Sequence, residues 1–239
     1  MKDAIEAQGV PHTEVDLILV NGASVDFSYT LRPGDRVSVY PVFESLDIAP
    51  LLRLRPAPLR EPRFVCDVHL GQLARRLRLL GFDTVYRNDY RDPEIAAIAL
   101  HERRIVLTRD RLLLHRRVIE RGTFVRSTDP DEQLVEVVRR FQLEHRVSPF
   151  SRCLECNGVI VPVAKEEVLD RIGEDTRRRH QEFRRCPVCL RIYWPGTHHE
   201  RMMARMKRLL PDAAELRIKS RKEIRNFEEA LQVIQRSPP

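Results

Sequence analysis

The sequence lacks any apolar run long enough to cross a membrane. A membrane-spanning helix needs about 20 consecutive apolar residues, and no stretch of the 239 residues approaches that length. The opening segment, MKDAIEAQGV, also lacks the apolar stretch of a secretory signal. We therefore expect a cytoplasmic protein without a membrane partner.

Cysteine is scarce, and most of it stands in two short motifs. Four of the five cysteines form two Cys-x-x-Cys pairs, made by Cys153, Cys156, Cys186 and Cys189. In a reducing compartment this spacing indicates a metal site rather than disulfides, and four thiolates in two tight turns are typical of a structural zinc site. A redox role is the alternative, although the presence of two pairs argues against it. Cys66 stands alone in an apolar segment and is predicted to be a small buried side chain.

No internal repeat divides the chain, so its organisation follows from changes in composition and pattern. The 29 residues between the cysteine pairs exceed the usual spacing, which predicts an inserted helix within residues 164–185. Five segments are expected: a helix-and-hairpin module (1–46), a proline-rich linker (47–62), an α/β domain (63–149), a zinc ribbon (150–200) and a basic helical tail (201–239).

Residues 63–145 alternate strand and helix patterns. The segments RFVCD, FDTVYR, RIVLT and GTFVR are predicted strands. The leucines of residues 70–80 follow helical spacing, and Gly81 stands where a C-terminal helix cap belongs. Asp92 and Pro93 open a second helix, and residues 131–144 form a long amphipathic one. This alternation predicts an α/β fold in three layers, with a central parallel sheet covered on both faces.

Cationic residues outnumber anionic ones. The chain has 42 Lys and Arg against 35 Asp and Glu, which gives a formal net charge of +7. Most of these cations are arginine, which forms two-pronged bonds to phosphate and stacks on bases. The charge is compatible with a nucleic-acid partner and equally with an ordinary basic surface.

Two acids follow predicted strands of the α/β domain. Asp67 comes after RFVC, and Asp110 after RIVLTR. Ligands of parallel sheets bind beyond the carboxyl ends of the strands, so these carboxylates could hold Mg²⁺ or Mn²⁺, and such a metal could activate water. Spacing does not choose a third acid among Asp89, Asp92 and Glu94. The alternative is that Asp67, Asp110 and Asp92 cap the helices that follow them and that Glu94 favours the helix dipole.

Positive charge follows Asp67 at once, in the helix of residues 70–80. At about 100° per residue, Arg75 and Arg76 lie opposite the leucine face, and Arg78 lies at its border. These arginines, together with Arg109, are expected to hold the phosphates of RNA. In the second cysteine motif, Trp194 could stack on bases and His198 could contact phosphate. Core filling and simple solvent exposure are the respective alternatives.

Four ordered motifs carry a resemblance to a known family. The segments FVCDVHLGQLARRLRLLGFDT, RIVLTRDRLL, RCLECNG and CPVCLRIYWPGTH resemble the Mut-seven C-terminal RNase family, whose fold is PIN-like. The resemblance implies a nuclease-type domain followed by a zinc ribbon, with Asp67 and Asp110 holding a divalent metal and Arg75 and Arg78 touching substrate. One departure is that PIN-type nucleases often carry another acid shortly after the one equivalent to Asp110. The site would then either borrow Asp92, Glu94 or Asp129 or be too poor in acids to cleave well.

The N-terminal segment resembles a partial β-grasp, ubiquitin-like domain of the sulfur-carrier kind. LILVNGASVDF and LRPGDRVSVYPVF carry this likeness, but the usual first hairpin is missing and no Gly-Gly terminus follows YPVF. Docking of a protein partner is therefore expected rather than thiocarboxylate chemistry.

Three functional hypotheses follow from these features. The first is a metal-dependent endoribonuclease with a structural zinc ion. The second is an RNA- or ribosome-binding protein on a degenerate nuclease fold, and the third is a protein-interaction adaptor. The enzyme is expected to bring at least three acids within about 5 Å of one another, close enough to share a metal, whereas the binder needs only a basic surface. The class of RNA is not specified by the sequence.

Overall fold

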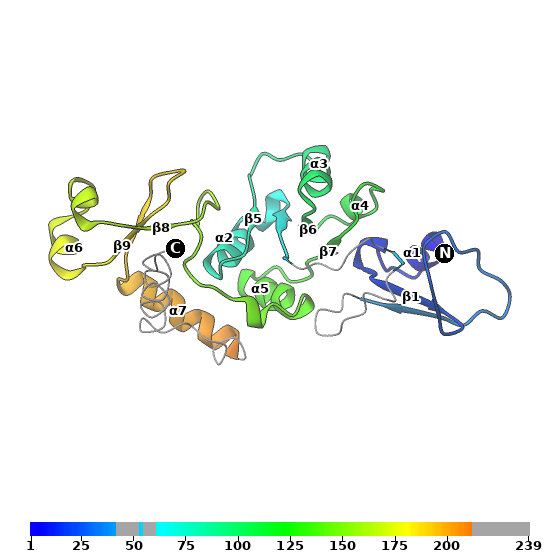
Figure 1. The fold of residues 1–239 in the computed structure, drawn as a ribbon. Coiled ribbons are helices and arrows are strands. Elements are labelled where there is room, and N and C mark those ends of the chain that lie inside the picture. The colour runs from blue at the N-terminus through cyan, green and yellow to red at the C-terminus, as the bar shows by residue number, and fades with distance from the viewer. Residues whose placement is uncertain (42–52, 55–60, 212–239) are drawn as a thin grey trace, which may run out of the picture.

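The computed structural model describes residues 1–41, 53–54 and 61–211. Most of the predicted linker and the tail beyond residue 211 lie outside the described residues. The chain forms an α/β domain with a small module on either side, as Figure 1 shows. Within the described ranges, no helix combines the length and the apolar character that crossing a bilayer requires.

A parallel sheet lies at the centre of the α/β domain. Its four strands follow the order β5-β4-β6-β7, and all three neighbouring pairs are parallel. The predicted strands are thus confirmed, with the bounds Phe64–Cys66 for β4, Thr84–Val85 for β5, Ile105–Thr108 for β6 and Gly122–Phe124 for β7.

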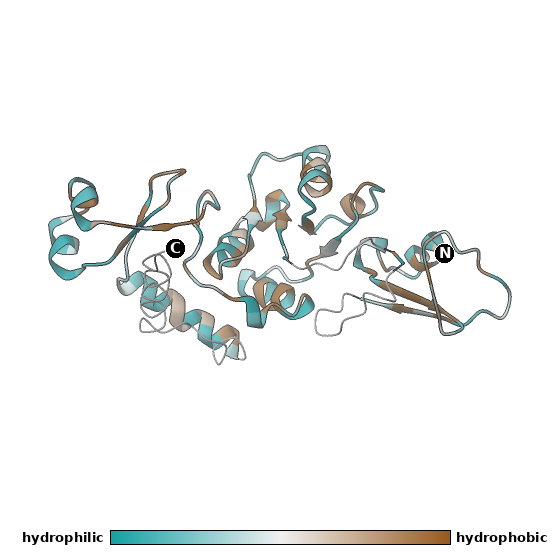
Figure 2. Cartoon of the chain, viewed as in Figure 1, coloured by the Kyte–Doolittle hydropathy of each residue, from teal (hydrophilic) through white to brown (hydrophobic). Residues whose placement is uncertain are grey.

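Helices cover both faces of this sheet, because successive strand residues point to opposite sides. Phe64 and Cys66 belong to the apolar core beneath α2 and α5, whereas Val65 packs in the core beneath α3 and α4. Figure 2 shows these central strands in brown, the colour of hydrophobic residues. The helix bounds are Gly71–Leu79 for α2, Asp92–Glu102 for α3, Arg111–Leu114 for α4 and Pro130–Arg140 for α5. The expected three-layer α/β architecture is confirmed.

The predicted end of α2 is also confirmed. Gly81 adopts a left-handed φ of +95°, its N–H donates to the Arg78 carbonyl at 3.0 Å, and the Phe82 N–H donates to the Leu77 carbonyl at 3.0 Å. This pair of bonds is the Schellman motif, which satisfies carbonyls that the helix end would leave free. It turns the chain directly into β5.

The N-terminal module contains the predicted helix and hairpin. Strand β1 pairs with β2 and with β3, both antiparallel. Asn21 and Gly22 both have positive φ, at 51° and 86°, as a two-residue hairpin turn requires. The bounds are Lys2–Ala7 for α1, His12–Glu14 for the short 3-10 helix η1, Leu17–Val20 for β1, Ala23–Val25 for β2 and Val37–Tyr40 for β3.

The cysteine-containing module is a small antiparallel sheet with the order β10-β9-β8. Its strands are Val161–Val163 (β8), Phe183–Arg185 (β9) and Ile192–Tyr193 (β10). The prediction of a single inserted helix within residues 164–185 is wrong in part. The insertion holds the 3-10 helix η5, Lys165–Arg171, and the short α6, Glu174–Arg179, whereas its last three residues form β9 because they pair with both neighbouring strands.

A longer helix, α7, spans Thr197–Leu209 and packs back on the α/β domain. Its Met206 is buried in the core beneath α2 and α5. It therefore begins within the segment expected to be zinc ribbon and continues into the expected basic tail. Two further 3-10 helices complete the described elements, η3 at Val68–Leu70 and η4 at Glu144–Arg146.

Candidate active site and metal centre

Asp67 lies at the carboxyl end of β4, as its position in the sequence predicts. Its side chain is only 4% exposed. One carboxylate oxygen, Oδ1, accepts the backbone N–H of His69 at 2.8 Å and so caps η3. The other, Oδ2, accepts the Thr108 hydroxyl at 2.5 Å and the Arg109 N–H at 3.3 Å. The carboxylate is therefore held rigidly between two neighbouring strand ends.

Asp110 lies beyond the end of the adjacent strand, β6. Its Oδ1 accepts the Leu112 N–H at 2.8 Å and caps α4. Its own N–H donates to the Thr108 hydroxyl oxygen at 2.8 Å. Thr108 thus joins Asp67 to Asp110 through two hydrogen bonds. Both acids have the capping role that was the alternative interpretation, and both also lie at the sheet edge where ligands bind.

The proposed additional acids do not join this pair. Asp92 does not cap α3, because Arg91 is the N-cap; Asp92 is the first helical residue and lies 3.4 Å from Arg116. Glu94 accepts the Arg91 N–H at 2.8 Å in a capping box. Asp89 pairs with Arg87 at 2.6 Å, and Asp129 caps α5.

The expected cluster of three acids is therefore not formed. In the described part of the chain, the only set of three or more metal-ligating side chains within 4.8 Å of one another is the four cysteines. The sequence could not reveal this, because the same carboxylate can cap a helix, pair with a cation or hold a metal, and Asp92 finds its partner Arg116 24 residues further along the chain.

The structure contradicts a second prediction, which concerns Arg78. This arginine was predicted to touch substrate, but it is 3% exposed. Its Nε donates to the Thr84 carbonyl at 2.8 Å, and its Nη1 donates to the carbonyls of Leu154 at 3.1 Å and Glu155 at 2.6 Å. The cysteine module covers this side of α2, so the guanidinium is unavailable to RNA.

The other predicted cations differ in exposure. Arg75 is 56% exposed and pairs with Glu155 at 2.6 Å. Arg76 is mostly buried against Asp131, at 2.8 Å. Arg109 uses its Nη1 to donate to three backbone carbonyls beyond β7. Of the four, Arg75 presents the most accessible charge, whereas Arg76 and Arg109 hold neighbouring segments together.

The four cysteines converge as their spacing predicts. The Sγ atoms of Cys153 and Cys189 are 3.4 Å apart, and those of Cys156 and Cys186 are 3.3 Å apart. A tetrahedral site with Zn–S bonds of about 2.3 Å places its sulfurs about 3.8 Å apart. Four soft thiolates within 4.8 Å therefore fit zinc. Cys66 does not belong to this set of converging ligand atoms. It is the last residue of β4 and is fully buried, and burial raises the pKa of its thiol.

Comparison with known proteins adds the family. A family model described as Mut7-C RNAse domain matches residues 62–206, which is more than half of the chain. The chain belongs to this RNase-domain family. A second family model, Mut7-C ubiquitin, matches residues 1–47. Searches of curated proteins and of solved structures returned no match.

The Mut7-C match spans the parallel sheet and the cysteine module as one unit, which accords with the contacts between them. It supports a nuclease-type function directed at RNA and leaves the metal chemistry to be tested. The structure places two residues beside the acids that the sequence analysis did not single out. Thr108, directly before the Arg109-Asp110 pair, links the two acids. His69 is exposed two residues after Asp67.

Tyr193 is a further residue near the metal centre. Its hydroxyl lies 3.0 Å from the Cys153 Sγ and accepts the Leu154 N–H at 3.2 Å. The predicted RNA contacts of this module lie elsewhere: Trp194 is 38% exposed, and His198 is exposed in the first turn of α7.

Proposed function

We propose that the protein is a metal-dependent endoribonuclease whose active site lies at the carboxyl ends of β4 and β6. The observation that carries this proposal is the arrangement of Asp67 and Asp110 around Thr108 within a Mut7-C RNAse domain. The substrate class is RNA, and its phosphates would approach the exposed Arg75 and His69.

Two carboxylates are chemically sufficient for this role. Mg²⁺ is commonly held by one or two carboxylates, several waters and the phosphates of the substrate. Asp67 accepts three hydrogen bonds from the protein, and a carboxylate offers about four acceptor positions. Asp110 is half-buried and accepts one, from Leu112, which leaves more of its acceptor positions for an ion. Asp67 would orient the ion and Asp110 would supply most of the accessible oxygen.

A bound Mg²⁺ or Mn²⁺ would supply an activated water and stabilise charge on the phosphodiester. The residues of the chain do the rest: Thr108 and the Arg109 N–H fix the Asp67 carboxylate, and exposed cations orient the backbone of the RNA. The structural zinc site is separate from the proposed active site, because its four cysteines lie in the cysteine-containing module.

A second candidate function follows from the capping roles. Because both acids cap helices and no third acid joins them in the described residues, the domain could bind RNA without cleaving it. The ribosome could provide the RNA that the domain binds. In this second function, a protein partner could bind the ubiquitin-like module. Binding would then depend on cationic side chains and weaken steeply with salt.

Substitution by asparagine separates the two functions. Asparagine caps helices about as well as aspartate, so Asp110→Asn keeps its cap and removes the charge that a metal needs. Asp67→Asn also removes the charge, but its amide nitrogen replaces the oxygen that accepts from Thr108 and Arg109, so its unfolding free energy is measured beside its activity. With Mn²⁺ and an RNA panel, we expect each variant to lose at least about 100-fold in cleavage rate, because even groups outside the ligand shell commonly contribute 10- to 100-fold.

RNA binding is measured in parallel, with Asp175→Asn as the control. Asp175 lies on α6 in an exposed ion pair with Arg179. Cleavage by the wild type and the control, combined with binding but no cleavage by the two variants, would support the enzyme. Equal binding and no cleavage by all four proteins would favour the RNA-binding platform.

A further inference from the structure

Arg78 is a buried cation that makes no direct ion pair with a carboxylate in the described part of the chain, although the charge of the Glu155 side chain acts on it. Its hydrogen bonds all go to backbone carbonyls, those of Thr84, Leu154 and Glu155. A buried charge without a counter-charge in direct contact is costly. Carbonyl oxygens solvate the guanidinium but carry no net charge, so its compensation has to come from elsewhere.

The four-cysteine cluster can supply that charge. Two of the three carbonyls belong to Leu154 and Glu155, which lie between Cys153 and Cys156 in the first metal-binding turn. Four thiolates carry −4 and a zinc ion carries +2, so the loaded centre has a net charge of −2. Burial lowers the pKa of Arg78, and the charges of Cys66, Cys153, Cys156 and the Glu155 carboxylate oppose that effect.

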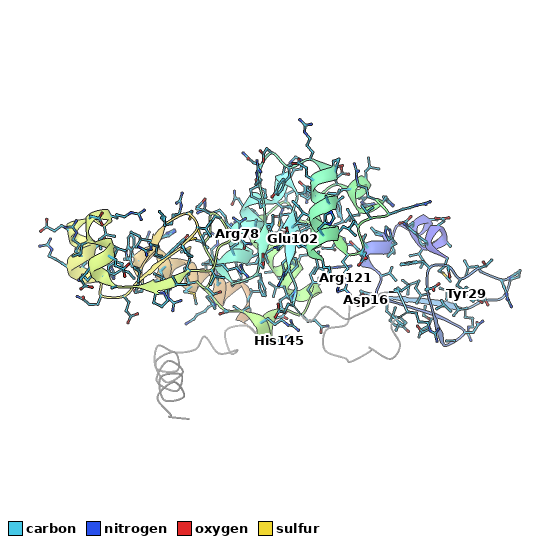
Figure 3. All side chains as sticks on the ribbon, turned by 45° about the horizontal axis from the view of Figure 1, so that its top comes forward. Asp16, Tyr29, Arg78, Glu102, Arg121 and His145 are labelled. Carbon is cyan, nitrogen blue, oxygen red and sulfur yellow. The ribbon has the colours of Figure 1, made fainter. Side chains whose placement is uncertain are left out.

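The same turn is bonded to the edge of the nuclease sheet. Strand β5 begins at Thr84, whose carbonyl accepts from Arg78 and whose N–H donates to Asn157 Oδ1 at 3.0 Å. Asn157 directly follows Cys156, and its Nδ2 donates to Asp83 at 2.7 Å. Figure 3 labels Arg78 on α2, where the α/β domain meets the cysteine module. The metal-binding turn thus covers the outer edge of β5.

From β5 the contacts continue to the candidate active site. Tyr86 comes directly after β5, and its hydroxyl donates to the Val68 carbonyl at 3.1 Å, next to Asp67. The ring also packs closely on Gly71 at the start of α2, where an added Cβ would lie 2.6 Å from the Tyr86 hydroxyl oxygen. A displaced β5 would therefore disturb the segment that holds Asp67.

We infer that Arg78 is a positioning residue of the metal centre, which balances the charge of the zinc–thiolate cluster and fastens the Cys153–Cys156 turn to β5. Loss of zinc then loosens the sheet edge beside Asp67. The inference goes beyond the proposed ribonuclease activity and does not depend on it, because charge balance and strand attachment exist whether or not the protein cleaves RNA.

A zinc-competition experiment tests whether Arg78 balances the charge of the zinc–thiolate cluster. The zinc-loaded full chain is challenged with a chromogenic chelator, and Arg78→Gln and Arg78→Lys are compared with Arg75→Gln. Arg75 contacts the same turn but through the Glu155 side chain and at the surface. We expect zinc affinity to fall about 10- to 100-fold in Arg78→Gln, less in Arg78→Lys, and about fivefold at most in Arg75→Gln, since surface pairs contribute little.

Hydrogen exchange tests whether zinc and Arg78 hold the Cys153–Cys156 turn to β5. In the wild type, removing zinc should accelerate exchange of the Thr84 amide, which donates to Asn157. In zinc-loaded Arg78→Gln the same amide should exchange faster than in Arg75→Gln. If Arg78→Gln does not fold, Arg78→Lys and the zinc titration of the wild type still provide the test. Unchanged zinc affinity in both Arg78 variants, or unchanged Thr84 exchange on zinc removal, would overturn the inference whatever the RNA assays show.

Discussion

Asp83 organises a group of polar side chains just before β5. Its Oδ1 accepts from Arg104 Nη1 at 2.6 Å and from Asn157 Nδ2 at 2.7 Å, and its Oδ2 lies 3.5 Å from Arg152. Burial by itself would raise the pKa of Asp83, but the hydrogen bonds from Arg104 and Asn157 and the charges of Arg104 and Arg152 outweigh it. The pKa of this carboxyl therefore lies below its ordinary value of 3.8.

Asp83→Asn should lower the free energy of unfolding by about 1–3 kcal/mol at pH 7, because the buried Arg104 loses an ionised partner. A depressed carboxyl pKa stabilises the fold above its unfolded-state value and loses that contribution as pH falls through the folded-state value. The difference between wild type and variant should therefore shrink below about pH 4. Urea unfolding at pH 7 and pH 3.5 measures it, with Asp175→Asn as an exposed control. A difference that stays constant with pH would contradict this account.

Helix α2 is the element on which the two candidate sites converge. Its first residue follows η3, which Asp67 caps, and its buried face carries Arg78. Its last turn contacts the segment that leads to the cysteine module, since the carbonyls of Leu79 and Leu80 accept the N–H groups of Phe150 and Ser148. The end of this helix therefore determines how the cysteine module sits against the sheet.

Gly81→Ala should break this end. An L-residue at the left-handed φ of +95° is strained by about 1–2 kcal/mol, and the new Cβ would clash with the Ser148 backbone carbonyl. We expect a loss of at least about 2 kcal/mol in unfolding free energy, measured by denaturant titration. Gly173→Ala is the control, because φ is negative there and no atom lies within 4 Å of the added Cβ. Equal stability of the two variants would be inconsistent with the proposed role of Gly81.

At the scale of the molecule, both edges of the parallel sheet are covered by a neighbouring module. The cysteine module bonds to β5, and the ubiquitin-like module bonds to β7 through Glu14. This glutamate is 8% exposed and accepts from the Phe124 N–H at 2.9 Å, the Thr123 hydroxyl at 3.0 Å and Arg140 at 2.9 Å. Uncovered edge strands are prone to association, so the two modules protect the sheet. Figure 3 labels Asp16 and Arg121 near the β7 junction.

Glu14→Ala should weaken the attachment of the ubiquitin-like module to β7. It leaves the Arg140 guanidinium and the Phe124 N–H without their acceptor, which should cost about 2 kcal/mol or more of unfolding free energy. Faster hydrogen exchange at the Phe124 amide should accompany that loss. Glu120→Ala serves as the control, since Glu120 is exposed nearby. If Phe124 exchanges equally slowly in Glu14→Ala, the module is held to the sheet by other contacts.

Local patterns made a large part of this structure predictable. The strand and helix alternation of residues 63–145, the left-handed Gly81 and the convergence of four cysteines depend on periodicity and on residue type, which act within a few neighbours. The position of Asp67 and Asp110 at strand ends was equally accessible. The roles of the other acids could not be predicted from the sequence. Helix capping and metal binding use the same carboxylates, and only the neighbours that the tertiary fold brings to each carboxylate distinguish the two roles.

Arg78 marks the boundary between the two kinds of information. The sequence by itself determined that this arginine lies on a helix at the border of an apolar face, because helical rotation fixes that angle. Only the tertiary structure decided that the border faces a metal-binding turn 76 residues further along the chain. The same holds for Glu14, whose partners lie more than 100 residues away. Burial and charge compensation depend on which distant segments meet, and no local pattern encodes that.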